Sequence, residues 1–145
     1  ILGLIETGRS EGARITTGGG RTGHDRGWFV EPTVFADVDN KMTIAQEEIF
    51  GPVLSVIPFE DTADAVRIAN DSPYGLGGSV WGDAEEATAI ARKVRTGTIQ
   101  VNHFGMAFSA PFGGYKNSGL GRELGPEGVD AFMEKKSLSL DPATA

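Results

Sequence analysis

Two adjacent carboxylates, Glu47 and Glu48, stand directly before the apolar step and Gly-Pro turn of residues 49–52, which lead into the strand-like run 53–57. An unpaired charge at the mouth of a buried strand is costly, so a carboxylate in this place is a candidate for binding. Its two oxygens could accept hydrogen bonds from a ligand. The alternative is a structural carboxylate that caps nearby backbone amides, and these residues alone leave both open.

Alternating strand and helix patterns have to position these residues. The segments are a continuous apolar strand over 53–59, a helix over 61–69, a short strand over 79–81, a helix that opens at Asp83 and ends at Gly97, and a strand over 98–102. This order predicts an α/β fold with a parallel-sheet βαβαβ core and right-handed crossovers. Ligands of such sheets gather at the carboxyl ends of the strands, so Asn102 and the loop 103–109 occupy a site-like position.

The two ends of the chain are less regular. We expect a helix over 1–12 with Gly12 as its C-cap, a strand over 13–17, a Gly-rich loop over 18–27, a strand over 28–35 with an edge or bulge at Pro32, a short helix over 126–133, a last strand over 137–140 and a frayed tail.

Composition excludes several classes of function. The net charge of −7 disfavours binding to nucleic acid or to an anionic membrane, and no apolar run approaches the roughly 20 residues of a membrane span. The chain has no cysteine, which rules out disulfides and thiolate metal sites within it and is compatible with a cytoplasmic protein. The two histidines, His24 and His103, are far apart, so no metal-ligand spacing exists.

Two glycine-rich stretches resemble phosphate-binding loops but lack the strand or helix that such loops need. Residues 119–125 approach the dinucleotide fingerprint with one residue too many, but the preceding residues 113–118 are loop-like rather than a strand. No helix follows the glycines at 18–20. Both stretches are better read as turns.

Several stretches, in order along nearly the whole chain, resemble the NAD(P)-dependent aldehyde dehydrogenase superfamily. They are Glu47-Glu48-Ile49-Phe50-Gly51-Pro52-Val53, Ala69-Asn70-Asp71-Ser72-Pro73-Tyr74-Gly75-Leu76, the run from Gly97-Thr98 to Asn102, Pro111-Phe112-Gly113-Gly114-Tyr115-Lys116-Asn117-Ser118-Gly119, and Glu123-Leu124-Gly125. The resemblance implies that Glu48 holds the nicotinamide ribose of NAD or NADP and that Glu47 is its structural partner. It also implies that Phe50 packs near the nicotinamide, although simple core packing remains an alternative role for this ring.

The loop after Asn102 resembles the family's aldehyde-binding loop. The resemblance implies that Phe104, Phe108 and Phe112, with Met106, form an apolar wall of the aldehyde pocket; ordinary core packing is again the alternative. No arginine or lysine lies between Asn102 and Phe112, which disfavours a carboxylate-bearing substrate.

The same resemblance implies what lies outside the chain. In the family, a cysteine thiolate attacks the aldehyde to give a thiohemiacetal, hydride leaves for NAD(P)+, and a thioester is hydrolysed to the carboxylic acid. The cysteine, the general-base glutamate, the oxyanion-hole asparagine and the Rossmann segment all precede the matched portion. We therefore expect a C-terminal third that is inactive alone, and the adenosine contacts that would decide between NAD and NADP are outside it.

Residues 1–134 would be part of the catalytic domain, and residues 135–145 would be the oligomerisation strand and tail. The expected partners are a small-molecule aldehyde, the rest of the same polypeptide and further copies in a homodimer or homotetramer. The alternative is a truncated, non-catalytic homologue that acts through oligomer or partner contacts.

Overall fold

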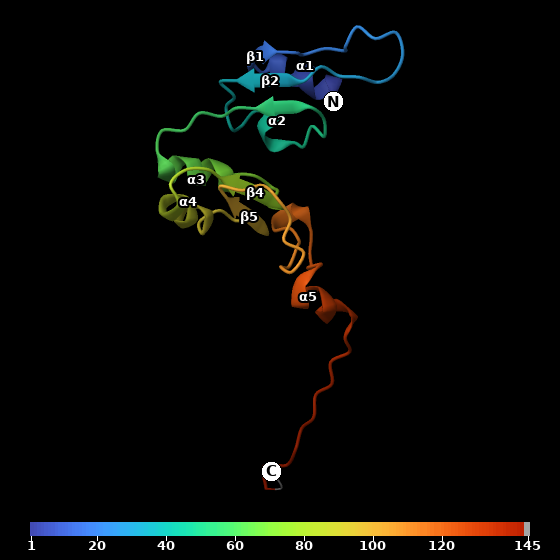
Figure 1. The fold of residues 1–145 in the computed structure, drawn as a ribbon, viewed down its shortest axis with the longest axis vertical. Helices are drawn as coiled ribbons and strands as arrows, with labels where there is room; N and C mark the ends of the chain where they lie inside the picture. The colour runs from blue at the N-terminus through green and yellow to red at the C-terminus, as the bar shows by residue number, and fades with distance from the viewer. Residues whose placement is uncertain (144–145) are drawn as a thin grey trace. The chain divides into compact units, whose positions relative to one another are not determined.

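The computed structural model describes residues 1–143, a mixed α/β chain in which no helix of the described part is long and apolar enough to cross a membrane. The chain divides into two compact units, one from Ile1 to Pro73 and one that begins at Tyr74. Figure 1 labels the helices and strands of both units.

The first unit is built on a three-stranded sheet in the order β1-β2-β3. Its elements are α1 (Leu2–Ser10), β1 (Arg14–Thr17), β2 (Thr33–Ala36), α2 (Thr43–Gln46), β3 (Val53–Ser55) and α3 (Thr62–Asn70). The central strand β2 pairs antiparallel with β1 and parallel with β3. Between β1 and β2 the chain runs out through a long loop (Figure 1).

The core of the first unit lies around Phe35, whose side chain is completely buried. Along β2, Thr33 and Phe35 are buried and Val34 and Ala36 are half-buried, as strand alternation requires. Ile5 of α1 and Ile44 of α2 pack against Phe35 in the same cluster. Gly8 allows this packing, because a Cβ there would lie 2.7 Å from Cδ1 of Ile44.

Local signals set the helix ends. The Asp61 carboxylate accepts a hydrogen bond from the backbone N–H of Asp64 at 2.8 Å and so caps α3. α1 ends with Glu11 as its C-cap, one residue before the predicted Gly12. Gly12 then turns the chain, and its φ of 99° lies in the left-handed region that favours glycine.

The second unit contains a parallel strand pair, β4 (Gly77–Val80) and β5 (Thr98–Val101), joined by α4 (Ala84–Ala91). Asp83 caps α4 by accepting hydrogen bonds from the backbone N–H groups of Glu85 and Glu86. Three short helical elements follow: η1 (Lys116–Ser118), α5 (Gly125–Val129) and η2 (Asp130–Phe132).

The prediction of a single βαβαβ sheet is wrong. In the structure β3 pairs with β2, and β4 and β5 form a separate pair. The backbone explains the partner of β3, because the N–H of Thr33 donates to the Pro52 carbonyl and the N–H of Val56 donates to the Phe35 carbonyl. The order of strands along the chain gives their connections but not the edges at which they pair.

Several strand and helix boundaries also differ from the prediction, most of all in three segments. The strand expected over 28–35 begins only at Thr33, after Pro32, which has no N–H to donate to a ladder. The strand expected over 53–59 ends at Ser55, and the helix expected to reach Gly97 ends at Ala91.

The predicted strand at residues 137–140 does not form within the described chain. No partner strand is present there, and Leu138 and Leu140 are exposed by 79% and 71%. The segment after η2 extends away from the rest of the second unit (Figure 1). The domain division after residue 134 and the pairing of this segment with another copy stay predictions.

Candidate functional site

The segment that carries Glu48 leaves α2 in an extended conformation. Glu47 is the C-cap residue of α2, with φ of −104° and ψ of 142°, and its backbone N–H donates to the Thr43 carbonyl. The chain therefore stops coiling one residue before Glu48, and the side chains of Glu47 and Glu48 are both exposed.

The Glu48 carboxylate makes no hydrogen bond or ion pair with any residue that the structure describes. The alternative role, a carboxylate that caps backbone amides, is thus not formed within residues 1–143. Both oxygens of Glu48 remain able to accept hydrogen bonds from a ligand.

Phe50 has an unusual backbone. Its φ of 53° lies in the left-handed region, which costs a non-glycine residue about 1–2 kcal/mol. Its ring is 83% exposed, so core packing within the described chain does not offset this cost. Gly51 follows it, and the absence of a Cβ lets this turn lie close to Ile1, because a Cβ there would lie 2.6 Å from Cδ1 of Ile1.

In the second unit, Asn102 stands at the carboxyl end of β5, as the sequence predicts. Its side-chain amide forms two hydrogen bonds of 2.8 Å with the Gly82 backbone. The amide oxygen accepts from the Gly82 N–H, and the amide nitrogen donates to the Gly82 carbonyl. Asn102 also has a positive φ of 52°, which turns the chain sharply into the loop. Two residues before Asn102, the Gln100 side chain donates to the Gly105 carbonyl at 2.8 Å.

The predicted pocket phenylalanines differ in burial. Phe104 and Phe108 are 85% and 73% exposed, and Met106 is 54% exposed, so none of these three is core within the described residues. Phe112 is half-buried, and its backbone exchanges two hydrogen bonds of 2.7 Å with that of Glu123. Phe112 is therefore the most firmly placed member of the predicted wall.

A contact among glycines holds the segment around Phe112 and was not predicted from the sequence. The Gly75 carbonyl accepts hydrogen bonds from the N–H groups of Gly97 and Tyr115, at 3.0 and 2.8 Å. A Cβ on Gly97 would overlap the carbonyl oxygen of Gly113. The glycines at these positions were a signal of close backbone approach.

Arg122 is a second group that sequence reasoning missed. Its guanidinium lies 5.4 Å from the ring centre of Tyr115 and donates to the carbonyls of Gly114 and Gly121. Its position next to a glycine-rich run was the available signal, since exposed carbonyls in such a run need donors.

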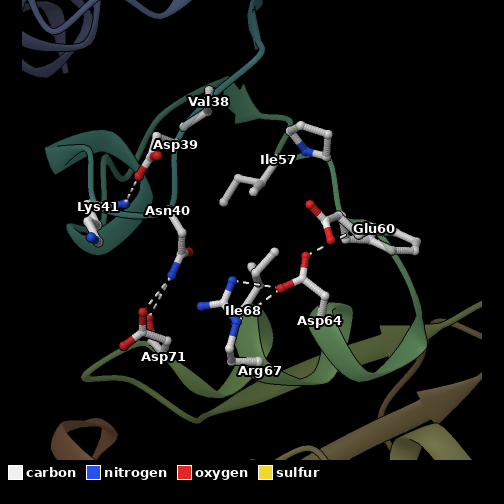
Figure 2. A pocket seen from close by; sticks show the side chains of 12 residues that line it. Val38, Asp39, Asn40, Lys41, Ile57, Glu60, Asp64, Arg67, Ile68 and Asp71 are labelled. Atoms are coloured by element: carbon white, nitrogen blue, oxygen red, sulfur yellow. Dashed lines mark hydrogen bonds and ion pairs between the residues drawn. The ribbon is translucent and has the colours of Figure 1, made fainter.

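An open pocket of about 380 Å³ lies elsewhere in the first unit, and none of the predicted site residues lines it (Figure 2). Two of its carboxylates have side-chain donors: Arg67 donates to Asp64 at 2.7 Å and Asn40 donates to Asp71 at 2.9 Å. The Arg67 hydrogen bond, followed by one from the Glu60 backbone N–H, lowers the pKa of Asp64. Within residues 1–143, no group of three or more His, Cys, Asp or Glu side chains could hold a metal ion.

The predicted cofactor residues, Glu48 and Phe50, thus lie on one exposed turn of the first unit. The predicted substrate residues, Phe104, Phe108 and Phe112, belong to the second unit, after the carboxyl end of β5.

Comparison with known proteins decides the family. Residues 1–138 match the sequence profile described as the aldehyde dehydrogenase family. The chain belongs to the aldehyde dehydrogenase family. It is 59% identical over 137 residues to the geranial dehydrogenase of Castellaniella defragrans, an alignment that covers 94% of this chain and 28% of that protein.

Solved aldehyde dehydrogenases have the same fold over this length. A Mycobacterium tuberculosis aldehyde dehydrogenase in complex with NAD+ superimposes with a TM-score of 0.92 at 58% identity, covering 97% of this chain and 29% of that one. A mutant of Pseudomonas syringae aldehyde dehydrogenase C in complex with NAD+ and octanal gives 0.87 at 46% identity, covering 92% and 28%. The chain therefore spans less than a third of the length of the relatives that it matches.

The family assignment made from the sequence is confirmed. Because this aldehyde dehydrogenase chain has no cysteine, it has no thiolate that could attack an aldehyde, and catalysis within this chain is not supported. The roles of Glu48, Phe50 and the three phenylalanines stay predictions.

Proposed function

We propose that this chain is the C-terminal part of an NAD(P)+-dependent aldehyde dehydrogenase, in which it holds the nicotinamide ribose and forms one wall of the aldehyde pocket. The complete enzyme would oxidise an aldehyde to a carboxylic acid with a cysteine nucleophile from outside this chain. NAD+ is bound in several of the similar solved structures, which supports a dinucleotide as the cofactor.

The observation that carries this proposal is the exposed Glu48 carboxylate, which has no partner among residues 1–143. Two free acceptor oxygens suit the two neighbouring hydroxyls of a ribose, so the donor and acceptor chemistry fits the group. The strained backbone of Phe50, two residues later, has no packing contact of its exposed ring to offset its cost, and a bound cofactor would supply one.

Bound NAD(P)+ would supply the hydride acceptor. Glu48 would accept hydrogen bonds from the ribose hydroxyls and so restrict where the attached ring can lie. Phe50 would offer its exposed ring as a packing surface beside it.

On the substrate side, Phe104, Phe108 and Phe112 would bind an apolar aldehyde and exclude water. The absence of arginine and lysine between Asn102 and Phe112 supports an uncharged substrate, because a carboxylate there would have no cation to pair with. A relative is named for geranial and a solved neighbour was crystallised with octanal. Copies of the complete protein would associate as a homodimer or homotetramer through residues 136–140.

The test is Glu48→Gln in the full-length protein, with Glu85→Gln on α4 as a control that removes the same charge from another exposed glutamate. A hydrogen bond to a charged group contributes about 1.5–3 kcal/mol, so we expect kcat/KM for the cofactor to fall about 10- to 100-fold. The control should stay within about twofold of the parent, as surface substitutions usually do.

Unchanged cofactor kinetics in Glu48→Gln would exclude the ribose role. A protein whose reading frame starts near Ile1, without a cysteine-bearing segment, would instead be the truncated homologue.

A further inference from the structure

The helix that leads to Glu48 cannot fix its own direction. α2 has only four residues, Thr43–Gln46, and a single turn is not stable alone because helix nucleation costs more than one turn recovers. Its N-cap residue, Met42, provides no side-chain cap. Other side chains must therefore hold α2 at both ends.

At the beginning of α2 the cap comes from a distant residue. Glu11, which follows α1, accepts hydrogen bonds from the backbone N–H of Thr43 at 2.7 Å and from its hydroxyl at 2.5 Å. A carboxylate at a helix N-terminus is also favoured by the helix dipole.

At the end of α2 the anchor is Gln46, the last residue of the helix and the second before Glu48. Its amide nitrogen Nε2 donates to the Asn40 carbonyl at 2.6 Å and to the Asp71 carbonyl at 2.9 Å. Asn40 in turn donates to the Asp71 carboxylate at 2.9 Å, and Figure 2 shows the two side chains facing each other. Gln46 thus joins α2 to the preceding loop and to the end of α3.

We infer that Gln46 is a positioning residue for Glu48. Its two amide hydrogens satisfy two fixed backbone carbonyls, so the end of α2 has one orientation and Glu48 leaves it in one direction. This inference rests on the proposed function, since it concerns how the same ribose-binding carboxylate is held. A purely structural role, in which Gln46 only secures α3, is the alternative.

The experiment uses the full-length protein with three substitutions at Gln46. Gln46→Glu keeps the shape but loses both donors and places a carboxylate against two carbonyl oxygens, and Gln46→Met removes the donors without adding a charge. Gln46→Lys keeps donors and should restore the contact. We expect Gln46→Glu and Gln46→Met to raise KM for NAD(P)+ about tenfold and to increase the isotope effect with an aldehyde deuterated at C1. Gln46→Lys should stay within about threefold of the parent.

Gln100→Glu is the matched comparison, because Gln100 makes a similar amide bond to the Gly105 carbonyl in the predicted aldehyde loop. Gln100→Glu should raise KM for the aldehyde and leave KM for the cofactor unaltered. The double variant Gln46→Met with Glu48→Gln should be no worse toward the cofactor than Glu48→Gln alone, because Gln46 acts through Glu48.

Three outcomes would overturn the inference. They are a lower melting temperature with unchanged cofactor KM and isotope effect in Gln46→Met, additive effects in the double variant, or equal damage from Gln46→Lys and Gln46→Met. If Glu48→Gln alone is silent, the proposed function fails and this inference fails with it. If Glu48→Gln is damaging and Gln46→Met is silent, only this inference fails.

Discussion

Gly97→Ala is expected to damage the second unit severely, although it adds only one methyl group. Gly97 directly precedes β5, and its Cα lies against the carbonyl oxygen of Gly113, so a Cβ would overlap that oxygen. The obstacle is backbone, which cannot rotate away as a side chain could. Either the start of β5 or the segment after Phe112 must move.

The size of the effect follows from what this movement breaks. The N–H of Gly97 donates to the Gly75 carbonyl at 3.0 Å, and the N–H of Thr98 donates to the Leu76 carbonyl at 3.1 Å. Losing these two bonds costs about 0.5–1.5 kcal/mol each. Overpacking adds about 1–3 kcal/mol, so we expect a total of about 2–6 kcal/mol, a large share of the roughly 5–15 kcal/mol that stabilises a typical domain.

The assay is urea unfolding of the full-length protein, with Gly78→Ala as the matched control. Gly78 lies in β4, and no atom comes within 4 Å of a Cβ placed there, so its substitution should shift stability by no more than about 0.5 kcal/mol. The KM for the aldehyde should rise in Gly97→Ala, because the moved segment carries Phe112. Equal midpoints for the two alanine variants would show that the overlap does not govern the packing of β5, and would refute the reasoning.

Substitutions at three further residues test individual side-chain contacts. Asn102→Ala should destabilise the full-length protein by about 2–3 kcal/mol in urea, because it loses two hydrogen bonds to Gly82 and keeps a Cβ at positive φ. Asn102→Gly loses the same bonds without the Cβ, so it should cost only about 1–2 kcal/mol. Equal costs for the two variants would contradict the backbone argument. Asp61→Ala should cost about 1 kcal/mol by removing the cap of α3, which thermal unfolding would measure, and Asp61→Asn should cost little. Because Arg67 lowers the pKa of Asp64, this carboxylate stabilises the fold above its ordinary pKa of 3.8, and the contribution is lost as pH falls through the lowered value. Asp64→Asn should therefore make the free energy of unfolding fall less steeply as the solution is acidified. An unchanged fall in the variant would refute this.

Local features of the fold could be predicted from the sequence, and long-range ones could not. The beginnings of α3 and α4 were predicted to within one residue, because a cap such as Asp61 or Asp83 depends on residues within three positions of it. The partner of β3 was not, because it is β2, about 20 residues earlier across a loop and a helix. The alternation of strands and helices is the same whether β3 pairs forward or backward.

The candidate site divides in the same way. Glu48 and Phe50 could be singled out from their motif, and Asn102 from its place after a strand. Gln46 could not be recognised as an anchor, because Asp71, which accepts its hydrogen bond, is 25 residues away. An amide that binds two backbone carbonyls leaves no pattern of residue types in the sequence.

Burial in the second unit indicates how the chain reaches stability. Among residues 74–143, the buried apolar side chains are only those of Ala87 and Ala91, whereas Trp81 and Phe132 are 65% and 90% exposed. Two alanines bury too little apolar area to offset the conformational entropy of some 70 ordered residues. We therefore expect the isolated chain to need further polypeptide or a second copy to cover these surfaces. Light scattering and urea unfolding of the isolated 145 residues would test this, and a single cooperative transition of a monomer would contradict it.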